Sequence, residues 1–139
     1  MSNIAVVYWS GTGNTEAMAN FVAEGVTENG GNAEVMQCSD FSADKITAYD
    51  GFAFGCPAMG SEELEYDEFQ PLWDEVKGQL GDKKVVLFGS YEWAEGEWME
   101  NWKADADEAG VNVVDTLINY DAPDDEGEAN CKSLGAELA

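Results

Sequence analysis

A short run of glycine and hydroxyl residues, Ser10 to Thr15, constrains the fold of this chain more than any other stretch. Residues 4–9 before it form a continuous apolar segment with the β-branched and aromatic character of a buried parallel strand. After it, apolar residues recur at helical spacing over 18–26, which predicts a helix beginning near Asn14 or Thr15. Such a loop is a candidate phosphate site, because backbone N–H groups and the helix dipole converge there and the hydroxyls add donors.

The composition of the loop narrows the kind of phosphate group that it would hold. A nucleotide-hydrolysing loop needs a lysine where this chain has Thr15, and a dinucleotide-binding loop needs a third glycine where it has Glu16. The chain also contains no arginine and no histidine. These features favour a set of neutral donors around a terminal monophosphate. An ordinary strand–helix turn made of small residues is the alternative.

Strand and helix patterns alternate along the rest of the chain. Further strands are expected at 33–38, 52–56, 83–89 and 111–118, and further helices over the apolar stripe 69–80, over 97–109 and over 124–139. This alternation predicts an α/β fold, a doubly wound five-stranded parallel sheet in the order 2-1-3-4-5 with helices on both faces. At 139 residues the chain is expected to form a single domain, residues 1–139.

The net charge of −23 restricts the partners of the chain. Such a field repels nucleic acid and anionic membrane surfaces, and it favours a partner with a basic face and fast, salt-sensitive association. Solubility alone, or adaptation to high salt, would also account for the acidity. No apolar run approaches the roughly 20 residues that span a bilayer, and the chain begins without the basic flank of a signal peptide.

The three cysteines, Cys38, Cys56 and Cys131, are an odd number and contain no Cys-x-x-Cys pair. This usage indicates reduced cytoplasmic thiols or core residues rather than a disulfide framework. Because the cysteines are isolated and histidine is absent, we do not expect a metal site.

In a sheet of the predicted order, a ligand binds beyond the carboxyl ends of the strands, beside the first strand. Three loops are expected to meet there, at 10–15, 56–62 and 89–98. The second and third loops each carry one large polarisable side chain, Met59 and Trp93, among small or acidic residues. Facing each other, these two could sandwich a flat ring whose phosphate tail reaches the first loop. Either one alone is better explained as a packing residue.

Three segments of the chain resemble the flavodoxins, specifically the short-chain type known from anaerobic bacteria. They are Val7 to Thr15, Gly55 to Glu62 and Leu87 to Met99, in the same order and spacing over the whole length. The resemblance implies noncovalent binding of FMN and transfer of single electrons between redox enzymes. It places the following residues around the cofactor: Ser10, Gly11, Thr12, Gly13, Asn14, Thr15, Pro57, Ala58, Met59, Gly60, Glu62, Ser90, Tyr91, Glu92 and Trp93.

The resemblance also implies separate roles within this set. The loop from Ser10 to Thr15 would bind the phosphate, Met59 and Trp93 would flank the isoalloxazine ring, and Glu62 would recognise its pyrimidine edge. The backbone carbonyl of Gly60 would turn to meet the flavin N5 after the first electron, and glycine suits a turn that must flip.

Two positions depart from the pattern of close relatives. Pro57 stands where they often carry serine, so one donor to the phosphate is lost, and Ser90 is expected to compensate. Glu92 stands where they often carry glycine, which adds a negative charge near the flavin.

Acidic residues are expected to surround the flavin and to oppose its second reduction, which produces an anion. We therefore expect a low-potential carrier that shuttles between the semiquinone and hydroquinone of FMN. Six acids are expected to be exposed at the edge where electrons leave: Glu62, Glu63, Glu65, Glu92, Glu95 and Glu97.

The expected partners are basic-faced redox enzymes, namely reductases and the oxidoreductases that otherwise use ferredoxin. The chain itself is expected to be a cytoplasmic monomer and not an enzyme. One alternative is an FMN-dependent enzyme of the quinone reductase type, which would need a substrate pocket over the flavin and a nicotinamide site. Another is a phosphate-binding regulator without redox activity, which the Ser-Gly-Thr-Gly run contradicts.

Overall fold

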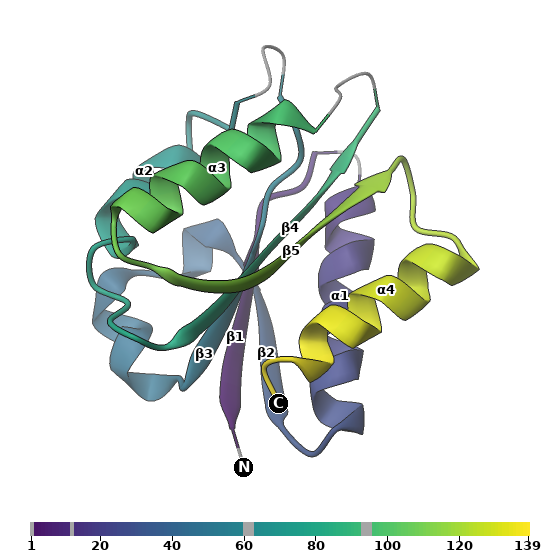
Figure 1. Cartoon of the computed structure of the whole chain (residues 1–139), viewed down its shortest axis with the longest axis horizontal. Coiled ribbons are helices and arrows are strands. Elements are labelled where there is room, and N and C mark those ends of the chain that lie inside the picture. Colours follow the sequence, from purple (N-terminus) through teal and green to yellow (C-terminus); the bar gives the residue numbers. More distant parts are fainter. Residues whose placement is uncertain (1, 12, 60–62, 93–95) are drawn as a thin grey trace.

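The computed structural model describes residues 2–11, 13–59, 63–92 and 96–139. Five strands form a parallel sheet in the order β2-β1-β3-β4-β5, which confirms the predicted topology (Figure 1). The strands are β1 (Asn3–Tyr8), β2 (Asn32–Gln37), β3 (Gly51–Gly55), β4 (Lys84–Tyr91) and β5 (Asn112–Tyr120). The α-helices are α1 (Asn14–Glu28), α2 (Phe69–Val76), α3 (Glu97–Glu108) and α4 (Asp125–Ala136).

The helices cover both faces of the sheet. Helices α1 and α4 lie on one face and α2 and α3 on the other (Figure 1). Strand β1 is buried on both sides, because Ala5 and Val7 pack into the core below α2 and α3 while Ile4 and Val6 pack against α1 and α4. The core on the α2 side contains a cluster of aromatic rings: Phe41, Phe52, Phe54, Phe69, Trp73 and Trp102. Phe52 and Phe54 are stacked, and the other contacts within the cluster are edge-to-face.

The segment between β2 and β3 contains two short 3₁₀ helices, η1 (Cys38–Asp40) and η2 (Ala43–Ala48), which the sequence patterns did not predict. Phe41 and Ile46 anchor this segment in the core below α2. Two apolar anchors are too few to produce a helical period, so no pattern of apolar spacing could reveal these turns.

Four predicted boundaries differ from the structure, three of them at strands that end beside the site. Trp9 and Cys56, expected as the last residues of their strands, lie just beyond β1 and β3. Strand β4 continues to Tyr91, two residues further than expected. Helix α2 ends at Val76 rather than near residue 80, and the chain turns there with an N–H donated by Gln79 to the carbonyl of Val76 at 2.9 Å.

Helices α1 and α4 approach each other closely through two glycines. A Cβ on Gly25 would lie 2.1 Å from the carbonyl oxygen of Lys132, and a Cβ on Gly135 would lie 2.0 Å from that of Val22. The two backbones are therefore in direct contact, which no residue with a side chain would permit. This contact determines where α4 lies, and the loop from β5 to α4 comes beside the start of α1.

Candidate functional site

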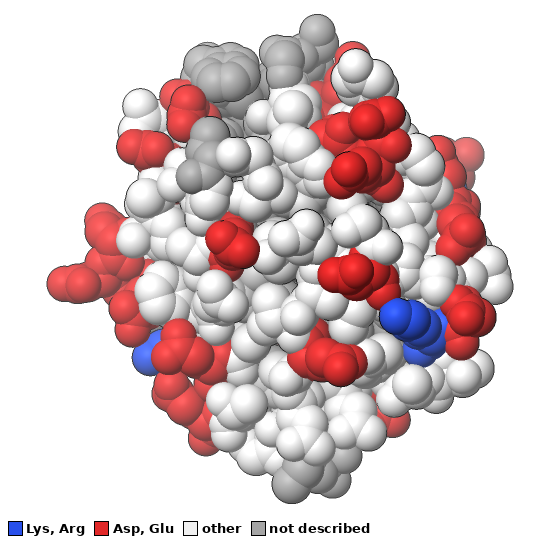
Figure 2. Space-filling view, turned by 180° about the vertical axis from the view of Figure 1, so that it is seen from behind, with Lys and Arg blue, Asp and Glu red and all other residues white. Residues whose placement is uncertain are grey.

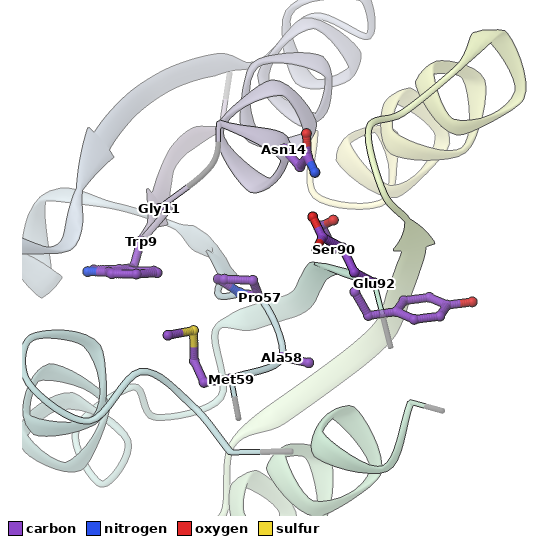
Figure 3. A pocket seen from close by; sticks show the side chains of 9 residues that line it. Trp9, Gly11, Asn14, Pro57, Ala58, Met59, Ser90 and Glu92 are labelled. Carbon is purple, nitrogen blue, oxygen red and sulfur yellow. The ribbon is translucent and has the colours of Figure 1, made fainter. Parts of the chain in front are cut away.

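A cavity of about 170 Å³ opens at the carboxyl ends of β1, β3 and β4, the edge predicted for a ligand (Figure 3). It is lined by Trp9, Gly11, Asn14, Pro57, Ala58, Met59, Ser90, Tyr91 and Glu92. The three loops that were expected to meet all contribute to it. Four of the predicted site residues lie outside the described residues: Thr12, Gly60, Glu62 and Trp93.

The first loop ends in the N-terminus of α1, which begins at Asn14 as predicted. Gly13 precedes it with φ of 96°, a left-handed conformation that costs other residues about 1–2 kcal/mol. The Ser10 hydroxyl oxygen accepts N–H bonds from Gly13 at 3.0 Å and from Glu16 at 3.3 Å. Both bonds use the lone pairs of that oxygen, so Ser10 can still donate its proton to an anion at the helix start.

Thr15, the last residue of the run, is almost completely buried. Its hydroxyl oxygen accepts the backbone N–H of Ser90 at 3.3 Å, which joins the start of α1 to the end of β4. Thr15 therefore ties the loop to the sheet, a role that the sequence pattern did not distinguish from phosphate binding.

Apolar side chains from two loops form one side of the cavity. Trp9 and Met59 lie toward this side, Ser90 and Glu92 lie opposite, and Pro57 is between them (Figure 3). Sequence reasoning missed Trp9, because an aromatic residue at the end of an apolar run has the pattern of a strand residue. Met59 lines the cavity as expected, whereas its pairing with Trp93 stays a prediction.

The loop after β3 is closed at its base by two main-chain bonds. The N–H of Met59 donates to the carbonyl of Glu63 at 3.0 Å, and the N–H of Glu63 donates back at 3.3 Å. Deeper in the molecule, the N–H of Glu65 donates to the Cys56 sulfur at 3.3 Å. The two ends of the loop are thus held together at two levels, on either side of the buried Leu64.

The expectation that Glu65 is exposed was wrong. Only 6% of this residue is exposed, because its carboxylate accepts the N–H groups that begin α2, from Asp67 at 2.9 Å, Glu68 at 2.7 Å and Phe69 at 2.9 Å. Burial alone would raise the pKa of this carboxyl, but the three N–H donors outweigh it and lower the pKa. The sequence pattern did not distinguish this helix-capping acid from the neighbouring acids that are exposed.

Glu65 should therefore make the free energy of unfolding depend on pH. Its pKa is lower in the folded state, so its contribution is complete above the unfolded-state value of about 4.3 and is lost as pH falls through the folded-state value. At pH 7 we expect Glu65→Gln to reduce the free energy of unfolding by about 1–2 kcal/mol, with a smaller difference below pH 4. Urea unfolding at several pH values measures this, with the exposed Glu24→Gln as control. A difference that stays constant with pH would contradict the argument.

A fourth loop, after β5, also reaches the site and was not predicted. Asp121 has φ of 57° and its N–H donates to the carbonyl of Tyr91 at 2.8 Å. Its own carbonyl accepts the Ser90 hydroxyl at 2.9 Å and the Asn119 side-chain amide at 3.1 Å. Its carboxylate accepts the side-chain amide of Asn14 at 3.1 Å. One residue therefore connects β4, β5 and α1 beside the cavity.

This contact bears on the two departures from the family pattern. Pro57 lines the cavity, and so does Ser90, but the Ser90 hydroxyl donates its proton to Asp121. Its expected role as a replacement donor to a phosphate stays a prediction. Glu92 is exposed at the cavity, so the charge that it adds is screened by water.

The three cysteines are buried, free thiols. Burial raises the pKa of Cys38 to about 11, with the nearby acids Glu68 and Glu65 adding to the effect, and burial raises that of Cys131 to about 12. Thiols with such pKa values are unreactive at neutral pH. Within the described ranges, no group of three or more potential metal ligands comes together, and no helix is long and apolar enough to cross a membrane.

Comparisons of the sequence and of the structure with known proteins agree on one family. The model of the flavodoxin family matches residues 6–133. The chain is 44% identical over 136 residues to a flavodoxin of Megasphaera elsdenii, covering 98% of both chains, and 40% identical over 134 residues to one of Clostridium beijerinckii, covering 96% and 97%. The solution structure of two-electron reduced Megasphaera elsdenii flavodoxin superposes with a TM-score of 0.88 at 43% identity, covering 97% of both chains. A flavodoxin from the domain Archaea superposes with a TM-score of 0.86 at 26% identity, covering 99% and 96%.

Proposed function

This chain belongs to the flavodoxin family and carries electrons between redox enzymes on noncovalently bound FMN, and from that premise we propose that it works at low potential, with the FMN phosphate held by the loop from Ser10 to Thr15. We propose further that the whole chain, residues 1–139, is one FMN-binding domain. FMN supplies the redox chemistry, and the residues of this chain bind it, orient it and limit its contact with water.

The observation that carries the proposal is the position of two features side by side at one edge of the sheet. The N-terminus of α1, with the hydroxyl of Ser10, offers donors to an anion. The adjoining cavity, with Trp9 and Met59 on one side, offers apolar surface to a flat ring. A molecule with a phosphate at one end and an aromatic ring system at the other fits both, and FMN has this form.

For the remaining site residues the proposal follows the family. Gly11, Thr12 and Gly13 would bring backbone N–H groups to the phosphate. Trp93 would cover the face of the ring opposite Met59, Gly60 would offer its carbonyl to N5, and Glu62 would bind the pyrimidine edge. Ala58, Tyr91 and Glu92 line the cavity, which supports contact with the ring and its chain.

The charge around the site supports a low potential. Glu92 is exposed at the cavity, and Glu63, whose backbone pairs with that of Met59, is also exposed. The chain contains no arginine or histidine, and its six lysines face 29 acidic residues. At about 10 Å and an effective dielectric constant of about 20, each carboxylate disfavours an added negative charge by roughly 1–2 kcal/mol before screening. About 1.4 kcal/mol corresponds to about 59 mV for one electron.

A redox titration of the FMN-loaded protein tests this proposal. We expect one FMN per chain and two separate one-electron potentials, with the second well below that of free FMN measured in the same buffer. A single step at the potential of free FMN would contradict the proposal. An FMN-dependent enzyme of the quinone reductase type is the alternative, and rapid oxidation of NAD(P)H by the protein alone would favour it.

We propose that the partners are redox enzymes with basic faces, including reductases and enzymes that otherwise use ferredoxin, and that the chain acts as a monomer in the cytoplasm. The net charge of −23 supports the first part, and three free thiols support a reducing compartment. Acidic side chains are scattered over the whole face seen in Figure 2, with few lysines among them. Charge alone therefore does not identify one docking face, and the test must separate local from overall charge.

Neutralising acids at the cavity should slow electron exchange with a basic reductase. We expect the double variant Glu63→Gln, Glu92→Gln to lower the second-order rate at least about threefold at low salt, because steering depends on charge near the contact. Stopped-flow kinetics at increasing ionic strength measures this, and the difference should vanish at high salt. The matched control is the double variant Glu24→Gln, Glu108→Gln. These two acids lie toward the C-terminal ends of α1 and α3, away from the cavity. Equal slowing by both pairs would show that only net charge matters.

A further inference from the structure

We propose that Asp121 is a positioning residue for the phosphate end of the cofactor site, holding the side-chain amide of Asn14 in the orientation that receives the phosphate. The inference rests on the proposed function, since it concerns the same site. It assigns a task to a loop after β5 that neither the sequence patterns nor the family resemblance singled out.

The conformation of Asp121 indicates that it is held in place by its contacts. Among the described residues it is the one non-glycine residue with a positive φ, 57°, in the left-handed region. That region costs a residue with a side chain roughly 1–2 kcal/mol, although aspartate and asparagine tolerate it better than most. Four hydrogen bonds of 2.8–3.1 Å to three different elements offset this cost. A strained residue with this many contacts next to a cavity is a candidate for function rather than for stability alone.

The contact with Asn14 is the one that reaches the site. Asn14 is the first residue of α1 and lines the cavity, and its side-chain nitrogen lies 3.1 Å from a carboxylate oxygen of Asp121. An amide nitrogen carries two protons, so this bond uses one and leaves the second as a donor. A charged acceptor also determines which end of the amide is nitrogen and restrains its rotation. Asn14 is thus presented as a donor at the positive end of the helix dipole.

The same carboxylate carries a negative charge, which acts against a phosphate nearby. Positioning strengthens FMN binding and repulsion weakens it, so removing the whole side chain mixes two opposite effects. Two variants separate them. Asp121→Asn removes the charge and keeps an oxygen acceptor for Asn14 in a residue that tolerates positive φ. Asp121→Gly removes the charge and the acceptor, and it keeps the backbone conformation and the carbonyl that accepts from Ser90.

Comparing these two neutral variants tests the proposal. By equilibrium titration, we expect Asp121→Gly to bind FMN about fivefold more weakly than Asp121→Asn, the effect of about one hydrogen bond, with riboflavin binding equal in both. The control pair is Asp82→Asn and Asp82→Gly, in an exposed turn before β4, for which FMN binding should be equal. Equal FMN binding by the two Asp121 variants would overturn the proposal, and so would an equal loss for riboflavin, since that would indicate a general loosening of the loop.

A second measurement uses the protein without FMN and so does not depend on the proposed function. In ¹H–¹⁵N spectra, the side-chain amide of Asn14 should give shifted, slowly exchanging signals in the parent and in Asp121→Asn, and signals close to those of free asparagine in Asp121→Gly. Unchanged signals in Asp121→Gly would overturn the role of Asp121. If the parent does not prefer FMN to riboflavin, the proposed phosphate site fails instead, whatever these spectra show.

Discussion

Riboflavin should bind this protein at least about a hundredfold more weakly than FMN, although the two share the same ring system. The reason is the proposed phosphate site at the N-terminus of α1, where the Ser10 hydroxyl and backbone N–H groups would donate to the phosphate. Charge-assisted hydrogen bonds contribute about 1.5–3 kcal/mol each, so two of them account for a factor of roughly 100 or more. Fluorescence titration of the two flavins at one ionic strength measures the ratio.

A variant of the loop sharpens this test. Ser10→Ala removes one proposed donor to the phosphate, and it also removes the acceptor for the N–H groups of Gly13 and Glu16. Its effect on the helix start is common to both ligands, so the ratio of FMN to riboflavin affinity isolates the phosphate contact. We expect that ratio to fall several-fold. Equal affinity of the parent protein for both flavins would refute the assignment of residues 10–15 to the phosphate.

The second large effect should come from Gly135→Ala, far from the cavity. A Cβ at this position would lie 2.0 Å from the carbonyl oxygen of Val22, so α4 must move away from α1. Overpacking of this kind costs about 1–3 kcal/mol. The cost of Gly135→Ala should lie at the upper end of this range, because the atom that the Cβ would meet belongs to the backbone of α1 and cannot rotate away. Urea unfolding should therefore show a free energy of unfolding lower by about 3 kcal/mol.

A control of the same chemical change is available at Gly78, which follows α2. A Cβ there would meet nothing within 4 Å, and its φ is not in the left-handed region. Gly78→Ala should leave stability unchanged or raise it slightly, because alanine restricts the unfolded chain. If Gly135→Ala were as stable as Gly78→Ala, helices α1 and α4 would not be in the backbone contact described here.

The sequence predicted the sheet order, the start of α1 and most of the cavity, because these features depend on local patterns. A buried parallel strand must be apolar on both faces, and β1 is. The glycine-rich turn and the first apolar residues of the helix after it lie close together in the sequence, within residues 10–19. Once five alternating strands are recognised, handedness leaves few arrangements, and the loops that meet at one edge follow from the order.

The missed features all depend on contacts between distant residues. Trp9 has the pattern of a strand residue, and only its position beyond β1 places it in the cavity. Glu65 is one acid among many until its carboxylate is found at the start of α2. No motif in the sequence around Asp121 indicates a role for it, and its partner Asn14 lies 107 residues away along the chain. Reasoning from local periodicity has no access to such contacts.

The position of β1 in the interior of the sheet has a consequence for how the protein acquires its cofactor in the cell. As the chain emerges from the ribosome, β1 can pair with β2 at once, but its other neighbour, β3, follows later, and β4 and β5 later still. Asp121, which accepts the side-chain amide of Asn14, is synthesised 107 residues after it. A nascent chain that already contains the complete Ser10–Thr15 loop therefore lacks the opposite walls of the site. We therefore expect FMN to be captured only after β4, β5 and the loop after β5 have been synthesised, so that the supply of cofactor affects the folded domain and not its earliest folding steps.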